Sequence, residues 1–133
     1  MTITYKTDCQ LTADEYIDIL KRSSLGRRRP VEDYVCMDGM VKNSNLLVSA
    51  WNDKLLVGVA RSVTDFHYAC YMSDLAVDED YQKQGIGKEL IKHSQKKLGP
   101  KCKIRLISAP DATAYYPKIG FTKNENCWQL TGG

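Results

Sequence analysis

The segment from Asp74 to Ile91 is the feature that most constrains how this chain can fold. It reads DLAVDEDYQKQGIGKELI, an apolar strand followed by a polar turn with glycines at 85 and 87 and then by helical spacing of apolar residues. A helix that starts in such a turn exposes its first N–H groups and the positive end of its dipole. Glycine lets an anion approach this backbone closely, and Lys83 and Lys88 add positive charge. The segment therefore predicts a strand–turn–helix unit that holds a pyrophosphate group.

The glycine turn does not match two common phosphate-binding loops. A Walker loop needs the pattern G-x-x-x-x-G-K-[ST], and a dinucleotide fingerprint needs a third glycine at position 90, where the sequence has Leu90. A G-x-G pair at the start of a helix also occurs as a tight turn with close helix packing and no ligand. From the turn alone, a phosphate site and a purely structural turn are both consistent with the sequence.

Periodicity along the rest of the chain predicts a mixed sheet with helices in one α+β domain, residues 1–133. A helix is expected after Thr12, because Glu15 three positions later completes a capping-box pattern. A second helix is expected from Val31 to Met40, with Tyr34 and Val35 facing inward. Further helices are expected at 87–98 and between Asp111 and Tyr116, and strands at 2–7, 46–51, 54–63, 68–77, 103–108, 120–121 and 127–130. The strand–helix–strand unit should be a right-handed parallel crossover.

Composition excludes several classes of protein. The chain is 43% hydrophobic and 26% charged, which argues against disorder, and its net charge of +3 is too small to indicate a nucleic-acid-binding protein. Its five cysteines are scattered and contain no C-x-x-C pair, so neither a disulfide framework nor a zinc site is predicted. The N-terminus lacks the apolar core of a signal peptide, and no apolar run is long enough to span a membrane. We expect a reduced, cytoplasmic protein without a metal, a membrane anchor or a nucleic-acid partner.

Two motifs together resemble a known family. Residues Gln82 to Gly87 fit the pattern [QR]-x-x-G-x-[GA], and Tyr115 to Phe121, about thirty residues later, resemble F-Y-x-K-x-G-F. In this order and spacing they are similar to the two signature segments of the GNAT superfamily of N-acetyltransferases. The resemblance is strongest between residues 74 and 121 and weak before Leu46. It implies a mixed, mostly antiparallel sheet of about six to seven strands, flanked by about four helices.

The resemblance also implies that acetyl-CoA is the co-substrate. The backbone of Leu75, Ala76 and Val77 would pair with the pantetheine arm as an added strand would. One N–H there, of Leu75 or Ala76, would polarise the thioester carbonyl. The backbone N–H groups that would hold the pyrophosphate belong to Gln82, Lys83, Gln84, Gly85, Ile86, Gly87 and Lys88.

Four residues are candidates for the chemistry. Tyr116 aligns with the tyrosine that the family often uses as general acid, and would protonate the departing CoA thiolate unless it only packs against the cofactor. Asp74 is the candidate base or substrate ligand, because relatives often carry an acid on this strand. Adjacent strand residues point to opposite faces, so Tyr71 and Ser73 could line the site instead. We expect direct transfer in a ternary complex rather than through a cysteine.

The run Arg27, Arg28 and Arg29 is the remaining candidate for substrate binding. By resemblance it borders the acceptor site, where guanidinium groups could bind a carboxylate or phosphate of the substrate; a solvated basic loop is the other interpretation. The size of the chain favours a small-molecule primary amine as acceptor, and family habit suggests a homodimer. The alternative to an enzyme is a non-catalytic module of the same fold that binds or senses acyl-CoA.

Overall fold

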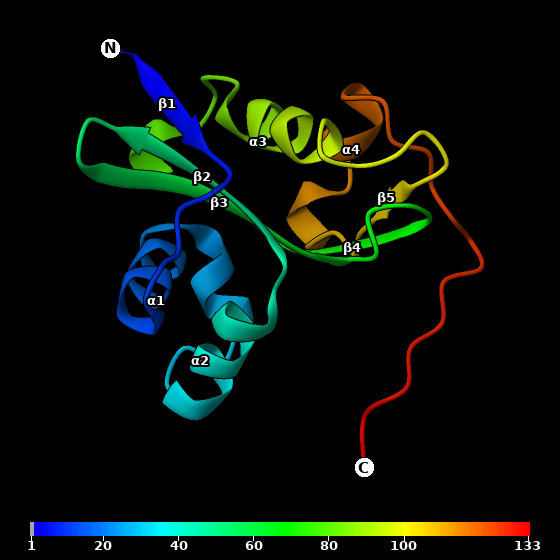
Figure 1. The fold of residues 1–133 in the computed structure, drawn as a ribbon, viewed down its shortest axis with the longest axis horizontal. Coiled ribbons are helices and arrows are strands. Elements are labelled where there is room, and N and C mark those ends of the chain that lie inside the picture. The colour runs from blue at the N-terminus through cyan, green and yellow to red at the C-terminus, as the bar shows by residue number, and fades with distance from the viewer. Residues whose placement is uncertain (1) are drawn as a thin grey trace.

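In the computed structural model, which describes residues 2–133, five strands form a single sheet in the order β1-β2-β3-β4-β5 (Figure 1). The strands are β1 (Ile3–Lys6), β2 (Leu46–Asn52), β3 (Leu55–Thr64), β4 (Ala69–Val77) and β5 (Lys103–Arg105). Strands β1 to β4 are antiparallel neighbours, and β5 joins β4 in parallel. This confirms the expected mixed, mostly antiparallel sheet, with five strands in the described residues instead of six to seven.

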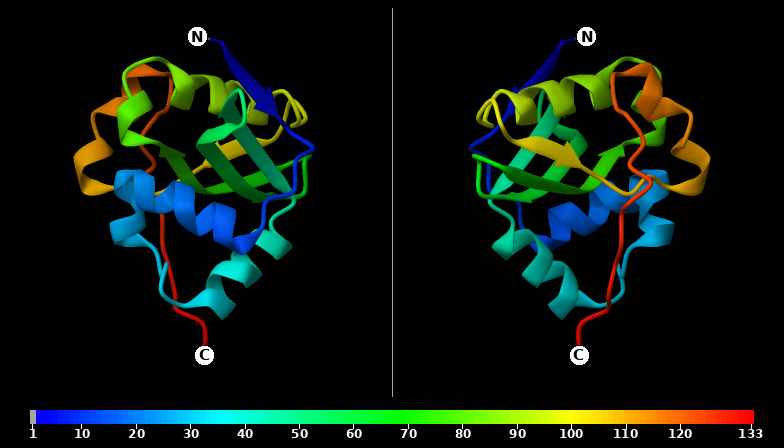
Figure 2. Two further views of the ribbon diagram at one scale, coloured as in Figure 1. Left: turned by 90° about the vertical axis from the view of Figure 1, so that its left-hand side faces the viewer. Right: turned by 90° about the vertical axis from the view of Figure 1, so that its right-hand side faces the viewer.

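Helices cover both faces of the sheet. The α-helices are α1 (Ala13–Arg22), α2 (Tyr34–Asn43), α3 (Ile86–Gln95) and α4 (Tyr115–Lys118), and the short 3-10 helices are η1 (Ser24–Arg28), η2 (Glu79–Tyr81) and η3 (Pro110–Ala112). Helices α1 and α2 lie on one face, and α3 and α4 on the other (Figures 1 and 2). Strand β4 and helix α3 follow one another along the chain, as the strand–turn–helix pattern predicts.

The predicted capping box starts helix α1. The hydroxyl of Thr12 accepts a hydrogen bond from the Glu15 N–H at 3.1 Å, and the Glu15 carboxylate accepts one from the Thr12 N–H at 2.9 Å. The apolar face of the helix buries Tyr16, Ile19 and Leu20 completely. These side chains form the apolar cluster between α1, α2 and the sheet, so the cap fixes where this layer begins.

Helix α2 begins three residues later than expected. Its N-cap is Asp33, whose carboxylate accepts a hydrogen bond from the Cys36 N–H at 3.1 Å. With this start, Met37 turns inward and is fully buried, whereas Tyr34 and Val35 are 53% and 82% exposed. The prediction that Tyr34 and Val35 face inward is therefore wrong, because both residues lie in the first turn, which the rest of the domain does not cover.

The two closing strands are also absent. Residues 120–121 and 127–130 are not in strands, and Trp128 and Leu130 are 90% and 98% exposed. In Figure 1 the red C-terminal segment runs away from the sheet. The strand predicted at 103–108 is limited to the three residues of β5, so the edge of the sheet presents too short a ladder to pair with a further strand.

Within residues 2–133, no helix is long and apolar enough to cross a membrane. Over the same residues, no group of three or more His, Cys, Asp or Glu side chains is arranged to hold a metal ion. All five cysteines are free thiols.

Candidate active site

The sheet opens between β4 and β5. The two strands pair only at Ala69–Lys103, Cys70–Ile104 and Tyr71–Arg105, whereas β4 continues to Val77. Beyond Tyr71, this edge of β4 has no neighbouring strand in the part of the chain that the structure describes. Backbone groups on that edge are available to a ligand with amides of its own.

A β-bulge marks the point where β4 leaves β5. On the β3 side, Arg61 pairs with Asp74 and the next residue, Ser62, pairs with Met72. Ser73 is therefore the extra residue of the bulge. A bulge bends its strand and increases the local twist, which explains why β4 diverges here.

The register determines which backbone groups face the opening. The Asp78 N–H donates to the Val57 carbonyl at 2.8 Å. In an antiparallel ladder, residues that bond to the neighbouring strand alternate with residues that point away from it. If this register is continued back along β4, the backbone N–H and C=O groups of Ala76 point toward β3. Those of Leu75 and Val77 point into the opening. Of the two N–H groups expected to polarise a thioester, this orientation favours that of Leu75.

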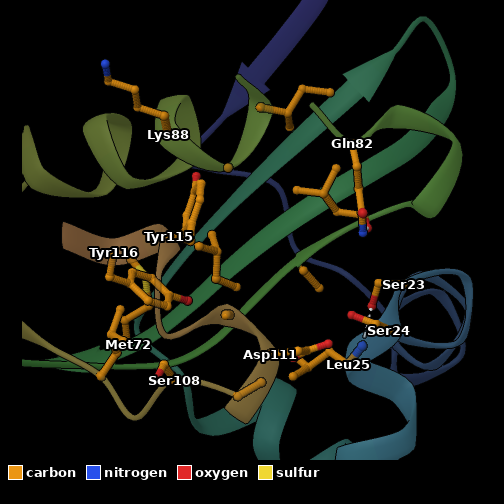
Figure 3. Close-up of a pocket in the computed structure, with 18 of the residues that line it drawn as sticks. Ser23, Ser24, Leu25, Met72, Gln82, Lys88, Ser108, Asp111, Tyr115 and Tyr116 are labelled. Atoms are coloured by element: carbon orange, nitrogen blue, oxygen red, sulfur yellow. Dashed lines mark hydrogen bonds between the residues drawn. The ribbon is translucent and has the colours of Figure 1, made fainter. Parts of the chain in front are cut away.

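A cavity of about 810 Å³ occupies the opening, within the range of small-molecule sites. Its walls come from β4, η1, the start of α3, the segment after β5, and α4, as Figure 3 shows. It brings together residues that the sequence places far apart. The predicted site residues that line it are Arg28, Arg29, Tyr71, Ser73, Leu75, Ala76, Val77, Gln82, Lys83, Gly85, Ile86, Gly87, Lys88 and Tyr116.

Three predicted site residues do not line this cavity. Gln84 is exposed in the turn and does not contribute to the wall. Arg27 is 80% exposed and faces Glu79, with Nη2 to Oε1 at 3.8 Å, so the expected substrate contact narrows to Arg28 and Arg29. Asp74 is buried on the α1 side of the sheet, where its carboxylate accepts hydrogen bonds from other side chains.

The glycine turn has the geometry that an anion site needs. Gly85 is the N-cap of α3 in the left-handed conformation, with φ +80°, and makes no side-chain cap. The first N–H groups of α3 are therefore not covered by a capping side chain. At Gly87 the constraint is close approach, because an added Cβ would lie 2.9 Å from the Tyr115 hydroxyl. Glycine thus suits position 85 because of its backbone conformation, and position 87 because a side chain there would crowd the Tyr115 hydroxyl.

Tyr116 projects from α4 into the cavity (Figure 3). Its ring packs edge-on against Tyr115 and Phe121, with centroids 5.2 and 5.3 Å away. Burial, with a smaller contribution from Tyr115, raises the pKa of Tyr116 above 10, and the positive charge of Arg29 partly opposes this rise. The phenol is therefore protonated at neutral pH, which is the form that can donate a proton.

Asp74 is saturated with hydrogen bonds on the α1 side of the sheet. Its Oδ2 accepts from the Tyr16 hydroxyl at 2.5 Å and from Arg61 Nε at 2.6 Å, and its Oδ1 accepts from Arg29 Nε at 2.6 Å. The side chain has no exposed surface. Burial by itself would raise the pKa of Asp74, but the hydrogen bond and charge of Arg61, with bonds from Tyr16 and Arg29, hold it below its usual value.

This geometry argues against the expectation that Asp74 is the general base or a substrate ligand. A carboxylate whose two oxygens already accept three hydrogen bonds, and whose pKa is lowered, is a poor proton acceptor. The same donors reach the bulge, since Arg61 Nη2 bonds the Ser73 hydroxyl at 2.8 Å and Arg29 Nη2 bonds the Ser73 carbonyl at 2.7 Å. We call Tyr16, Arg29, Arg61, Ser73 and Asp74 the bulge cluster; its hydrogen bonds join the bulge to residues of α1 and β3.

The cavity also includes residues that sequence reasoning did not place in a site. One carboxylate, that of Asp111, lies in the wall after β5, and the Tyr115 hydroxyl lies against the turn of α3. Asp111 follows the strand expected at 103–108, and this position at a strand end is a sequence signal for a site residue. The sequence alone indicated Asp111 only as the start of a helix. The other additional lining residues are Ser23, Ser24, Leu25, Met72, Tyr81, Leu106, Ile107, Ser108, Ala109, Ala112 and Ile119.

Comparison with known proteins agrees with this geometry. The profile described as "Acetyltransferase (GNAT) domain" matches residues 30–130. This chain belongs to the GNAT acetyltransferase family. An uncharacterised N-acetyltransferase, ycf52, of Pyropia yezoensis is 31% identical over 90 residues, which are 63% of the GNAT chain and 52% of that protein. The chain thus spans about half the length of the curated relatives it matches.

Solved structures share the fold at low sequence identity. A GNAT-family acetyltransferase from Streptococcus pneumoniae TIGR4 superposes with a TM-score of 0.79 at 20% identity, over 98% of this GNAT chain and 97% of that one. An aminoglycoside N-acetyltransferase, AAC(6')-Iy, solved in complex with CoA, superposes with a TM-score of 0.73 at 14% identity, over 98% and 95% of the two chains. At these identities the likeness establishes the fold.

Proposed function

We propose that this GNAT chain transfers the acetyl group of acetyl-CoA to the primary amine of a small molecule, by direct attack in a ternary complex. The observation that carries the proposal is the open edge of β4, where Leu75 and Val77 point into a cavity that is closed at one end by the glycine turn of α3. Pantetheine amides and a pyrophosphate need these two features side by side.

The residues present fit acetyl-CoA. The uncapped start of α3 offers backbone N–H groups and the positive end of a helix dipole to the pyrophosphate. Lys83 and Lys88 are also among the lining residues and add positive charge near the start of α3. The related AAC(6')-Iy protein was solved with CoA, which supports the same use of the fold here.

The proposed chemistry distributes three tasks among the lining residues. The Leu75 N–H stabilises the negative charge that develops on the thioester oxygen. Tyr116 donates a proton to the CoA thiolate that forms when the carbon–sulfur bond breaks. Because Asp74 is sequestered in the bulge cluster, Asp111 is the candidate carboxylate for the incoming amine, which loses its proton as the carbon–nitrogen bond forms.

Acetyl-CoA binding, measured by calorimetry, tests the cofactor part of this proposal. Replacing Gly85 by Glu puts a carboxylate at the N-terminus of α3 and a side chain at φ +80°, so we expect at least a tenfold loss of affinity. Gly39→Glu is the matched control, since Gly39 lies in α2 outside the cavity and an added Cβ there meets nothing within 4 Å. Absence of binding by the wild-type protein would refute the proposed function.

Release of CoA, followed with a thiol reagent across a panel of primary amines, tests catalysis. We expect Tyr116→Phe to lower kcat at least about tenfold with little change in acetyl-CoA affinity, because the hydroxyl acts only when sulfur leaves. Tyr34→Phe, on the exposed face of α2, is the control and should leave kcat unchanged. Tight binding without CoA release for any amine would instead support the non-catalytic acyl-CoA-binding alternative.

A further inference from the structure

The bulge cluster carries an unbalanced charge. Two guanidinium groups, those of Arg29 and Arg61, face the single carboxylate of Asp74. Tyr16 stays neutral, because burial and the Asp74 charge raise its pKa well above 10. The side chains of Asp74, Arg61 and Arg29 are 0%, 7% and 22% exposed, so an excess of one positive charge lies in a partly desolvated place. Such a charge is costly unless a negative partner approaches it.

Arg29 presents this excess charge to the cavity. Its Nε bonds Asp74 at 2.6 Å, its Nη2 bonds the Ser73 carbonyl at 2.7 Å and its Nη1 bonds the Arg28 carbonyl at 2.9 Å. These three bonds fix the guanidinium at the bulge. Arg29 lines the cavity, whereas Asp74 and Arg61 do not. The group is therefore a fixed positive charge beside the part of β4 that precedes Leu75.

We infer that Arg29 stabilises the thiolate of CoA as the acetyl group is transferred. This inference rests on the proposed function and adds a residue to it. In the step concerned, the amine nitrogen bonds the carbonyl carbon and the carbon–sulfur bond breaks. The electron pair of that bond goes to sulfur, and Tyr116 then supplies the proton that gives the free thiol. Arg29 acts while sulfur carries the charge, and it transfers no proton.

The arrangement suits electrostatic stabilisation better than recognition of an anionic substrate. The Nε–Nη2 edge of Arg29, which would bind a carboxylate or phosphate in two places, is already occupied by Asp74 and Ser73. The positive charge of Arg29 remains available to a ligand. Its hydrogen bonds fix the guanidinium group, so the charge does not have to move when a negative charge develops nearby. Arg29 and Tyr116 line the same cavity, and the positive charge of Arg29 lowers the pKa of Tyr116 against the larger effect of burial.

Other charged and titratable groups also face the cavity. They are Arg28, Tyr71, Tyr81, Lys83, Lys88, Asp111, Tyr115 and Tyr116. Any pH effect on ligand binding therefore contains contributions from these groups. A comparison of two ligands that differ only in whether the sulfur can ionise removes those contributions.

The test is the affinity for CoA and for S-methyl-CoA, measured by calorimetry between pH 6.5 and 9.5. The ordinary pKa of a thiol is about 8.5, and a thiolate favoured by the site ionises at lower pH when bound. We expect the affinity for CoA relative to S-methyl-CoA to rise with pH in the wild-type protein. In Arg29→Gln we expect this rise to be reduced about tenfold, which corresponds to a shift of about one pKa unit.

Two variants separate charge from structural damage. Arg29→Lys alters the bonds to Ser73 and Asp74 but keeps the positive charge, so it should retain most of the pH-dependent rise. Arg27→Gln is the matched control in the same segment, because Arg27 is 80% exposed and outside the cavity. It should behave as the wild type. Circular dichroism reports whether each variant is folded.

Each result decides a stated point. Equal loss of the rise in Arg29→Lys and Arg29→Gln would overturn the inference and assign Arg29 a structural role only. An unchanged rise in Arg29→Gln would overturn it as well. If Arg29→Gln does not fold, a flat ratio in the wild type or in Arg29→Lys overturns it. Failure of the wild type to bind either ligand would instead refute the proposed function.

Discussion

The environment of a single residue decides its role, and Asp74 is the clearest case. Its position on β4 beside the expected thioester site makes it a reasonable candidate base. The side chain, however, points to the α1 face and accepts three hydrogen bonds from Tyr16, Arg29 and Arg61. The carboxylate is thus the centre of an ion-pair network, and its chemistry is structural.

Replacement of Asp74 by Asn should destabilise the protein strongly. Two buried or half-buried guanidinium groups would lose their counter-charge, a change that typically costs about 3–5 kcal/mol. Chemical denaturation followed by circular dichroism measures the free energy of unfolding. Asp38→Asn is the control, because it alters a surface ion pair with Lys42 and should cost no more than about 0.5 kcal/mol. Similar losses in the two variants would contradict the assignment.

The lowered pKa of Asp74 also predicts an acid-dependent part of the stability. Because the folded pKa lies below the unfolded value of about 3.9, the carboxylate stabilises the protein above that pH. This contribution is lost as the pH falls below about 4 and through the folded pKa. We expect the free energy of unfolding of Asp74→Asn to fall less steeply than that of the wild type over this range. Parallel slopes would contradict it.

At the scale of the element, local signals fix where a helix starts when its cap is unambiguous. The capping box at Thr12 predicted the start of α1 and is present in the structure. For α2, Pro30 suggested the first turn, but Asp33 is the cap and the helix starts at Tyr34. Tyr34 and Val35 are therefore the first two residues of the helix and are exposed, and Met37, one turn further along, is the buried residue.

Removal of the α1 cap should have a moderate, local cost. Thr12→Ala deletes the side-chain oxygen that accepts from the Glu15 N–H, which typically lowers the free energy of unfolding by about 1 kcal/mol. Thermal unfolding monitored by circular dichroism measures the change. Thr122→Ala, in the exposed C-terminal segment, is the control and should be neutral. A neutral Thr12→Ala would show that packing of Tyr16, Ile19 and Leu20 alone determines the helix start.

At the scale of the whole molecule, the function proposed here depends on how the sheet ends. Strand β5 pairs with only three residues of β4, and the bulge at Ser73 then turns β4 away. The resulting opening is lined from η1 near the N-terminus to α4 near the C-terminus. The cavity is therefore a property of the assembled sheet and helices, and it depends on no single segment of the chain.

The C-terminal segment should contribute little to stability. Deleting residues 123–133 removes Trp128 and Leu130, which are 90% and 98% exposed, so we expect almost unchanged thermal unfolding and acetyl-CoA binding. Extending the deletion to include Phe121 should be costly, because that ring packs on Tyr116. A large loss of stability from the shorter deletion would show that the segment packs against the domain in solution.

The sequence by itself determined the order of the strands and α-helices from β1 to α4, the cap of α1, and the glycine turn. These features depend on hydrogen bonds and backbone conformations within a few residues, so local patterns encode them. It also indicated most of the residues that we propose face the cofactor, because those between Leu75 and Lys88 belong to one contiguous strand–turn–helix unit that lines the cavity.

Only the tertiary structure decided which side chains face which partner across the sheet. The phase of α2, the exposure of residues 127–130 and the burial of Asp74 each depend on segments far away in the chain. The contacts of Arg29 are of the same kind: its partners Ser73 and Asp74 lie 44 and 45 residues away. A one-residue bulge reverses the face of the strand side chains that follow it without changing their local pattern. Because of this long-range pairing, the carboxylate of Asp74, which the sequence suggested as a base, binds the guanidinium group of Arg29 at the bulge.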